Sequence, residues 1–406
     1  MKKIILIIAS GVILSAVEKS SAQNEVDVLR YSQITFGGTA RYNSMAGAFG
    51  ALGGDISTLS VNPAGIAIFR SHEITFSPSF FYQTTTSDYK GNSLYDYKYN
   101  INIGNTGVVF ADYKPDTQND WKGIMFGVGY NRLNSFHNRI TMEGRNNKSS
   151  LLDVYLSDAN SAGKTDDFDP FGTKLAWETW LIDFDSISKK YFHVLPKYGQ
   201  MQTKSVETTG HMGETVFALG GNYADKLYLG ITLGIPNIRY DEMSTYQEKT
   251  ESDTIYNFKK FELNENISTS GVGFNFKFGI IYRPADWVRI GGALHSPSFY
   301  DMHDKWNNDM TTYFSSSLKP LEEKSPEGLF DYSLVTPMRA MGTIGFIIKK
   351  VGLLGIDYEF VDYSSAHLRA SKYSYSKENR AIREKYGEAG NLRIGTEWRI
   401  NFVCVR

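Results

Sequence analysis

Hydrophobic and polar residues alternate with period two along many segments of the chain. Between Val272 and Tyr282 every second residue is large and apolar, and the residues between them are small or polar. The same pattern recurs at 124–130, 229–235, 354–360 and 392–398. Because successive side chains of a strand point to opposite faces, each segment predicts a β-strand with one apolar face.

The connections between these segments alternate in length. Short turns are predicted at 223–226, 283–286 and 349–352, with a slightly longer one at 115–120. Long polar segments lie between them at 84–98, 145–212, 302–328 and 368–389. Outer-membrane barrels have short periplasmic turns and long external loops. A soluble β-sandwich would show the same residue alternation with its apolar faces packed inward, but it seldom keeps this asymmetry of connections.

The pattern therefore predicts an all-β protein, an antiparallel transmembrane β-barrel at 73–406 with a long external loop at about 145–212. Several predicted strands exceed the usual length of about 5–6 residues. About ten strands are expected, at roughly 73–83, 99–114, 121–143, 213–223, 226–247, 258–283, 286–302, 331–349, 352–366 and 390–401.

The N-terminus has the features of a secretory signal peptide at 1–22. Lys2 and Lys3 precede the apolar stretch 4–17, and Ser20-Ser21-Ala22 offers small residues for cleavage after Ala22. A membrane anchor is the alternative, but the stretch is shorter than the roughly 20 residues that a span needs. No cysteine follows the cleavage site, which excludes a lipoprotein, and no later apolar run is long enough for a helical span.

Composition agrees with an exported β-protein. The chain has 37 Gly, 26 Tyr and 25 Phe, and its one cysteine, Cys404, cannot form an intrachain disulfide. The formal net charge of −1 provides no basic field, so nucleic acid is not an expected partner.

The segment 39–69 differs from the predicted strands. It is apolar and glycine-rich, and Gly53, Gly54, Pro63 and Gly65 interrupt short helical turns. Its motifs are Ala40-Arg41, Ala46-Gly47-Ala48-Phe49, Gly54-Asp55 and Asn62-Pro63-Ala64-Gly65. In these motifs the chain resembles the hatch of the outer-membrane long-chain fatty acid transporter family (FadL type), which includes aromatic-hydrocarbon uptake proteins.

The resemblance implies a barrel of about fourteen strands closed by an N-terminal hatch, here at 23–72. It implies capture of a hydrophobic ligand outside and sideways release beside a kinked third strand, against which Asn62, Pro63 and Ala64 would lie. The implied hatch or gate residues are Gly47, Gly54, Asp55, Asn62, Pro63, Ala64 and Gly65. The chain departs from the family in having about ten strands and in ending at 401–406 without a terminal aromatic residue, so we expect a C-terminally truncated chain.

The implied location is the outer membrane of a Gram-negative bacterium. The implied partners are hydrophobic small molecules, outer-membrane lipid and lipopolysaccharide, and the barrel assembly machinery, with the protein itself a monomer.

Charged residues occur on the small-residue face of the predicted strands. The cationic members would meet a ligand carboxylate or, as we favour, all of them form a neutralising network in the lumen. They are Lys277, Arg289, Arg339, Asp357, Glu359, Arg393, Glu397 and Arg399.

Other chemistry is weakly indicated. Gly47, Gly50 and Gly53 follow no βαβ strand, so they do not predict a nucleotide site. The carboxylates at 166–169 fit a solvated acidic loop better than calcium binding. No HExxH or GxSxG motif occurs. We therefore expect no enzyme activity, no cofactor and no metal.

The predicted function is passive uptake of hydrophobic compounds, such as long-chain fatty acids or aromatic hydrocarbons. Four aromatic residues of the long loop, Phe168, Phe171, Trp177 and Trp180, would form an external ligand groove or else pack the loop's own core. The alternatives are a general porin or structural barrel that transports no hydrophobic ligand, and a secreted glycan-binding β-sandwich.

Overall fold

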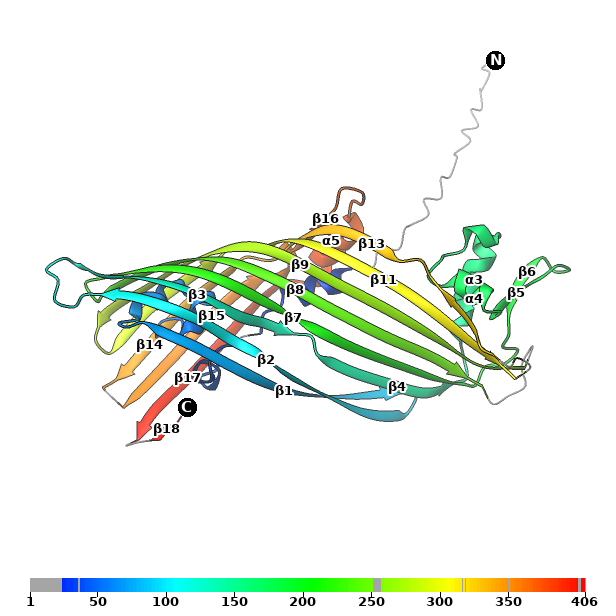
Figure 1. Cartoon of the computed structure of the whole chain (residues 1–406), viewed down its shortest axis with the longest axis horizontal. Helices are drawn as coiled ribbons and strands as arrows, with labels where there is room; N and C mark the ends of the chain where they lie inside the picture. Colours follow the sequence, from blue (N-terminus) through cyan, green and yellow to red (C-terminus); the bar gives the residue numbers. More distant parts are fainter. Residues whose placement is uncertain are drawn as a thin grey trace, which may run out of the picture.

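The computed structural model shows a large antiparallel sheet curved around short helical turns (Figure 1). The structure describes residues 24–35, 37–250, 257–315, 317, 319–349, 351–400 and 403–405, and the predicted signal peptide lies outside them. Within this part of the chain the large sheet has 16 strands, and a separate sheet contains β5 (Ile182–Asp185) and β6 (Lys190–His193). The predicted all-β class is confirmed.

Strands that follow one another in the chain mostly pair in the sheet. The order in space is β1-β2-β3-β7-β8-β9-β10-β14-β15-β17-β18, while β4 pairs with β7, and β11 pairs with β9 and β13. The bounds are β1 (Glu73–Tyr89), β2 (Asn92–Tyr113), β3 (Trp121–Ser135), β4 (Asn138–Asn146), β7 (Gln200–Tyr223), β8 (Leu227–Lys249), β9 (Phe258–Ala285), β10 (Val288–His295), β11 (Phe299–Phe314), β12 (Leu321–Lys324), β13 (Gly328–Val335), β14 (Arg339–Ile348), β15 (Gly352–Asp362), β16 (His367–Arg369), β17 (Glu388–Ile400) and β18 (Val403–Val405).

Three of the predicted strands are divided. β3 gives way to β4 at 136–137, β10 to β11 at 296–298, and β13 to β14 at 336–338. Pro297 and Pro337 lie in the last two breaks, because proline cannot donate to a strand ladder. The two breaks are adjacent, since the Thr336 N–H donates to the Ser298 carbonyl at 3.0 Å. Adjacent ribbons therefore bend at the same level.

The alternation of residues along β9 places its large apolar side chains on the outer face of the sheet, as predicted. The outward side chains of Val272, Phe276 and Tyr282 are 60%, 57% and 49% exposed, whereas Lys277 on the opposite face is buried. The wide exposure of large apolar side chains on one face distinguishes this sheet from a sandwich, which buries them.

The short turns lie where they were predicted, and the long connections are shorter than predicted. The β7–β8 turn contains Ala224 and Asp225, both at positive φ, which matches the twist of a tight hairpin. The predicted loop at 84–98 is wrong, because β1 and β2 continue to a tight turn at Lys90 and Gly91. The long connection between β4 and β7 runs from 147 to 199, since β7 already begins at Gln200.

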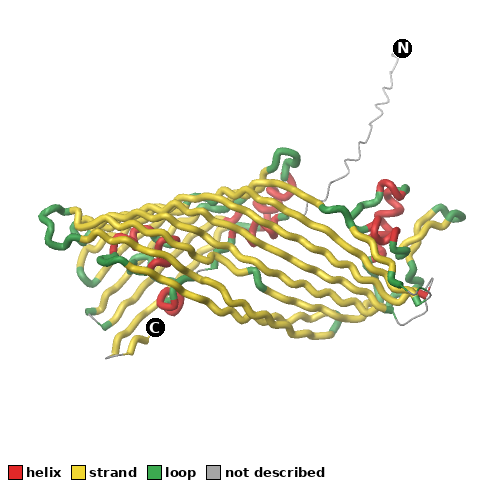
Figure 2. Tube along the Cα trace, viewed as in Figure 1, coloured by secondary structure: helices red, strands yellow, loops and turns green. Residues whose placement is uncertain are grey.

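The N-terminal segment forms short helices inside the curved sheet. They are α1 (Glu25–Ser32), α2 (Ala40–Ser44), η1 (Ile56–Ser60) and η2 (Pro63–Ile68). The connections between later strands contain α3 (Leu152–Ala162), η3 (Thr165–Asp167), α4 (Thr173–Glu178), η5 (Tyr363–Ser365) and α5 (Ser376–Lys385). Figure 2 shows these helical turns in separate groups along the sheet. None of the helices in the described ranges is both long and apolar enough to cross a membrane.

The two edges of the sheet are formed by β1 and by β17 with β18. Among the described strands, β1 pairs with β2 and no ladder joins it to β17 or β18. The sheet nevertheless surrounds the N-terminal helices, because strands from β2 to β17 contact them.

Candidate functional site

The segment 38–69, which is part of the hatch predicted at 23–72 and alone keeps that name below, fills the hollow of the sheet and packs directly on its backbone. A Cβ added at Gly230 of β8 would lie 2.2 Å from the Pro63 carbonyl oxygen. At Gly355 of β15 it would lie 2.0 Å from the Ala48 carbonyl oxygen, and at Gly395 of β17 2.1 Å from that of Met45. Glycine is therefore required at these wall positions for the close approach of two backbones.

Polar side chains of the wall also hold the hatch backbone. His295 on β10 bonds through Nε2 to the Val61 carbonyl at 2.7 Å, and Thr232 on β8 donates to the Leu59 carbonyl at 3.0 Å. Asp357 on β15 accepts the Gly50 N–H at 2.9 Å. Because these bonds come from different sides of the sheet, they oppose sideways movement of the hatch.

Asn62 organises the centre of the hatch. It is fully buried, and its Nδ2 donates to the Gly50 carbonyl at 2.7 Å. Its Oδ1 accepts the Ala64 N–H at 3.1 Å and so caps η2, with Pro63 as the first residue of that turn. The Asn-Pro-Ala motif is thus a cap that also ties two hatch turns together.

The family-implied position of this motif is wrong. Asn62 and Pro63 lie against Gly279 of β9 and Gly230 of β8, and Ala64 packs with Tyr228 and Ile281 on the same two strands. The hatch residues that reach the third strand are Leu59 and Ile66, next to Gly127, and Ser60, whose hydroxyl accepts Asn131 Nδ2 at 2.6 Å. The motif packs against β8 and β9 because Gly230 and Gly279, which have no side chain, lie on these strands and leave room for its backbone.

The other predicted hatch residues have local structural roles. Asp55 accepts the Ser57 N–H at 2.9 Å and the Thr39 hydroxyl at 2.6 Å, and so caps η1. Gly47 and Gly54 have φ of +74° and +66°, which only glycine adopts without strain. Gly65 lies beneath Thr58, where a Cβ would meet the Thr58 hydroxyl at 2.5 Å.

The predicted lumen charges lie inside the sheet and are mostly paired. Lys277 pairs with Glu214, and the two side chains are 5% and 1% exposed. Arg339 and Arg393 both bind Glu359, at 2.8 and 3.2 Å. Paired buried charges avoid the desolvation cost of an isolated ion.

Two of the remaining charges, Arg289 and Glu397, contact the hatch. Arg289 donates to the Leu52 carbonyl at 2.5 Å, and Arg41 of the hatch pairs with Glu397 at 2.8 Å. Arg399 lies 3.5 Å from Glu397 and is more than half exposed.

A small chamber lies between the hatch and α1. On the side of α1 its lining is apolar and includes Tyr31, Leu133, Met212 and Tyr300. On the side of the hatch it includes the Glu214–Lys277 pair, whose carboxylate also accepts the hydroxyl of Ser60 at 2.8 Å. The free space is about 50 Å³, well below the roughly 300–1,000 Å³ of small-molecule pockets.

Helix α1 closes the chamber on the side away from the hatch. Tyr31 is 2% exposed and packs edge-on against Phe136 and Tyr240. The Ser32 carbonyl accepts a hydrogen bond from Arg339 Nη2 at 2.6 Å. Helix α5 contacts the other end of α1, where Tyr386 donates to the Glu25 carbonyl at 3.0 Å.

Sequence reasoning missed α1, although a signal for it was present. Asn24 and Asp27 have the spacing of a capping box, and both of its hydrogen bonds are made. It also missed Glu214 and His295, which lie on inward-facing strand positions. A charged or imidazole side chain at such a position is a detectable signal.

The connection at 147–199 forms a small packed unit. Phe168 is 5% exposed and contacts Trp177 and Tyr191, so Phe168 and Trp177 belong to the core of this unit. Phe171 packs against Trp306 of β11, while Trp180 is 61% exposed. The structure therefore does not bring the four aromatic residues together in one groove.

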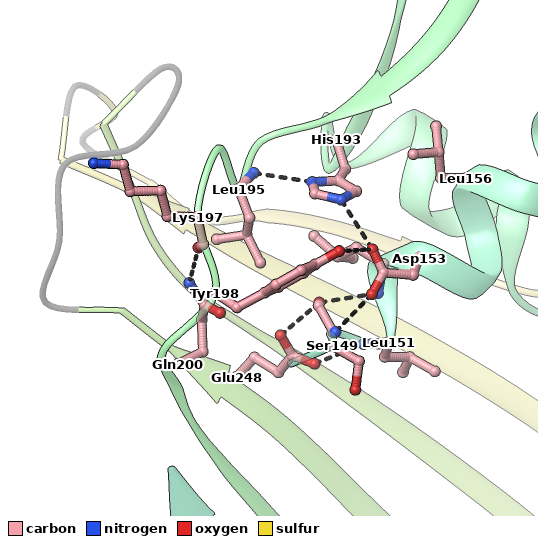
Figure 3. Close-up of polar contacts among 12 residues, drawn as sticks. Ser149, Leu151, Asp153, Leu156, His193, Leu195, Lys197, Tyr198, Gln200 and Glu248 are labelled. Carbon is pink, nitrogen blue, oxygen red and sulfur yellow. Dashed lines mark hydrogen bonds and ion pairs between the residues drawn. The ribbon is translucent and has the colours of Figure 1, made fainter. Parts of the chain in front are cut away.

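Polar contacts join this unit to the ends of β7 and β8 (Figure 3). Buried Glu248 accepts the Leu151 N–H at 2.7 Å. Asp153 accepts the Tyr198 hydroxyl at 2.8 Å and lies 3.2 Å from His193 Nε2. Partial burial alone would raise the pKa of Asp153, but hydrogen bonds from the Ser150 backbone, Tyr198 and His193 outweigh it and hold the pKa below its usual range.

The chain was compared with known proteins. A model of the uncharacterised protein family UPF0164 matches residues 8–119. The search of curated proteins finds no match.

Solved structures give further similarities. The Pseudomonas putida toluene transporter TodX is 9% identical with a TM-score of 0.47, covering 91% of this chain and 82% of its own. The CymD monoaromatic hydrocarbon channel is 10% identical at 0.43, covering 90% and 80%, and a Pseudomonas aeruginosa FadL homologue is 11% identical at 0.42, covering 91% and 78%. The FadL type that the N-terminal motifs predicted is among these structures.

Proposed function

We propose that the protein is an outer-membrane channel for the passive uptake of hydrophobic compounds. One observation carries the proposal: the outer face of the sheet is a continuous apolar band, while its hollow is closed by the hatch and by α1. On β9 the outward residues from Val272 to Tyr282 are all large and apolar. An apolar outer band is what lipid requires of a membrane-spanning sheet.

The chamber supports a hydrophobic cargo. Its apolar side is made by Tyr31, Leu133, Met212 and Tyr300, from which a ligand would gain about 25 cal/mol for each Å² of apolar surface buried. Since the chamber holds only about 50 Å³, the ligand binds after α1 has moved aside and takes the place of Tyr31. The substrates proposed are long-chain fatty acids or aromatic hydrocarbons.

The hatch and the lumen charges have supporting roles in this proposal. Asn62, Pro63 and Ala64 keep the hatch rigid, so cargo does not pass straight through the middle. The charge pairs around Glu214 and Glu359 fill the lumen without attracting ions. The contacts of Asn62 and the low exposure of both carboxylates support these roles.

The test is uptake of labelled oleate and labelled toluene by cells that express the full chain and lack other uptake channels. Ile34 lines the chamber from the N-terminal segment, so Ile34→Trp fills it without altering a strand. We expect uptake to fall by about tenfold or more, because a filled pocket loses the apolar burial of its ligand. The matched control is Ile231→Trp on the lipid-facing side, where the side chain is 54% exposed and uptake should be unchanged.

The same protein in a planar bilayer separates this function from that of a general porin. If the hatch closes the hollow of the sheet, we expect little steady ion conductance. Large steady conductance together with no oleate or toluene uptake above an empty-vector control would contradict the proposal.

A further inference from the structure

Two strand breaks lie side by side in the wall of the chamber. They are 296–298, between β10 and β11, and 336–338, between β13 and β14, here called the window. Among the described residues two hydrogen bonds join them, each of 3.0 Å: the Thr336 N–H donates to the Ser298 carbonyl, and the Ser298 N–H donates to the Thr336 hydroxyl. Of these two, one joins backbone to backbone, whereas three residue pairs of a regular antiparallel ladder share about two to four such bonds.

The prolines of the window keep it out of the ladder. Pro297 and Pro337 have no N–H to donate to a neighbouring strand. Irregular backbone at the depth of a membrane is tolerated only where it is buried in protein or lines a cavity. The window meets this condition, because Ser296, Ser298, Thr336 and Pro337 line the chamber.

The outer side of the window is apolar. Leu294 and Met338 are both 54% exposed, and Phe299 is 41% exposed. Phe299 is opposite Phe274 of β9, and their rings stack with centroids 5.2 Å apart. Since Phe274 belongs to the row of outward apolar residues on β9, the window lies within the apolar band.

The gap beside the third strand is already filled. β2 and β3 pair no further than Asn105 and Asn131, although both strands continue beyond these residues. The N-terminal residues 33–35 occupy the place beside β3, where the Thr35 N–H donates to the Leu133 carbonyl at 2.8 Å. Cargo that left here would have to displace this segment.

Polar side chains surround the same gap on the outer face. Ser135 of β3 is opposite His211 of β7, and His211 is opposite Arg239 of β8. Directly opposite residues share one face of a sheet, and the Arg239 side chain is 70% exposed. Arg132 reaches across the gap, with its Nε 3.5 Å from the Ile103 carbonyl oxygen. These groups make the gap a less favourable route for an apolar molecule than the window.

At the window little material separates the chamber from the outer surface. Tyr300 is 2% exposed and belongs to the lining both of the chamber and of a groove on the outer face. Phe299 and Val335, which adjoin the window in the chain, line the same groove. Separation of the two window segments would therefore connect the chamber with an apolar outer surface.

We propose that hydrophobic cargo leaves the chamber sideways through the window and enters the hydrocarbon of the membrane there, rather than beside the third strand. The two segments part when the bonds between Ser298 and Thr336 break, and the cargo passes Tyr300. The proposal rests on the proposed function, because it requires uptake of hydrophobic cargo through the chamber.

The test closes each route with a removable disulfide, in a Cys404→Ser background that has no other thiol. Ser298→Cys with Thr336→Cys locks the window, since the bonds between these residues keep their Cα atoms within the roughly 4.4–6.8 Å that a disulfide spans. Thr35→Cys with Asn134→Cys is the matched lock of the third-strand gap, since the Thr35 hydroxyl lies 3.3 Å from Asn134 Oδ1. This second lock leaves α1 free to move aside.

Cells that express each variant are oxidised with copper phenanthroline or reduced with dithiothreitol, and uptake of labelled toluene is then measured. Mass spectrometry of the purified chain confirms the disulfide. We expect uptake through the oxidised window lock to fall at least about tenfold below that of the same variant reduced, because a disulfide fixes the separation of the two segments. The lock of the third-strand gap should give equal uptake in both states.

Met338→Trp is a second variant, which keeps the window backbone and its hydrogen bonds. The larger ring covers the outer side of the window, so uptake should fall. Ile231→Trp is its matched control, because Ile231 is also 54% exposed but lies on β8, and its uptake should be unchanged.

Unchanged uptake in Met338→Trp, equal uptake by the window lock in both states, or equal loss from both locks would overturn the proposal. In each of these cases the parent chain still takes up toluene, so the proposed function stands. A parent chain that takes up neither toluene nor oleate instead contradicts the proposed function, and the window fails with it.

Discussion

Replacing Gly230 by alanine tests whether the wall glycines hold the hatch in place. The new Cβ would lie 2.2 Å from the Pro63 carbonyl oxygen, whereas ordinary contact begins at 3.4 Å. The hatch backbone must therefore move by the difference, 3.4 minus 2.2, or about 1.2 Å. Overpacking of this kind costs about 1–3 kcal/mol, and loss of a strand glycine returns about 0.5–1 kcal/mol, so the net destabilisation is about 1–2 kcal/mol.

The assay is urea unfolding of the detergent-purified protein, followed by tryptophan fluorescence, with planar-bilayer conductance as a second measurement. Gly342→Ala on β14 is the matched control, because a Cβ there meets nothing within 4 Å. We expect a lower urea midpoint and greater conductance for Gly230→Ala only. The reasoning is refuted if both substitutions shift the midpoint equally, or if Gly230→Ala shifts neither measurement.

Three further predictions concern the charges and the packed unit at 147–199. Lys277→Met should destabilise the protein by about 3–5 kcal/mol in urea unfolding, because it leaves Glu214 buried without its partner, and adding Glu214→Gln should restore most of the loss. Equal stability of the single and double variants would argue against a buried ion pair. The folded pKa of Asp153 is lowered, so its stabilising effect is complete above the unfolded pKa of about 3.9 and is lost as pH falls through the folded value. Proteolysis within 147–199 should accelerate in that acidic range for the wild type, and Asp153→Asn should already be cleaved faster at pH 7 with less further change. Phe168→Ala should likewise speed cleavage of this unit through loss of about 3–5 kcal/mol of core packing, whereas Trp180→Ala, 61% exposed, should leave the cleavage rate unchanged.

Much of the fold was predictable because its determinants are local. Alternation on β9 placed large apolar side chains on one face, and a tight hairpin follows from the residues at Ala224 and Asp225. The Asn62-Pro63-Ala64 motif implied a hatch through its resemblance to the FadL type, whereas its role as a cap with an N-terminal proline was shown by the structure.

The position of the hatch and the contacts of α1 were decided only by the tertiary structure, because they depend on residues far apart in the chain. Gly230 and Gly279, not the third strand, receive the Asn62 motif, because strand register and sheet curvature set which backbones meet. The same holds for the clamp of α1 between Tyr240 and Arg339.

Sequence by itself determined the β class, the apolar face of the strands and the short turns, since each follows from neighbouring residues. The tertiary structure alone decided where the hatch rests, which charges pair and which aromatic residues are buried. The physical reason is that these properties arise from contacts across the sheet, and sequence periodicity carries no information about them.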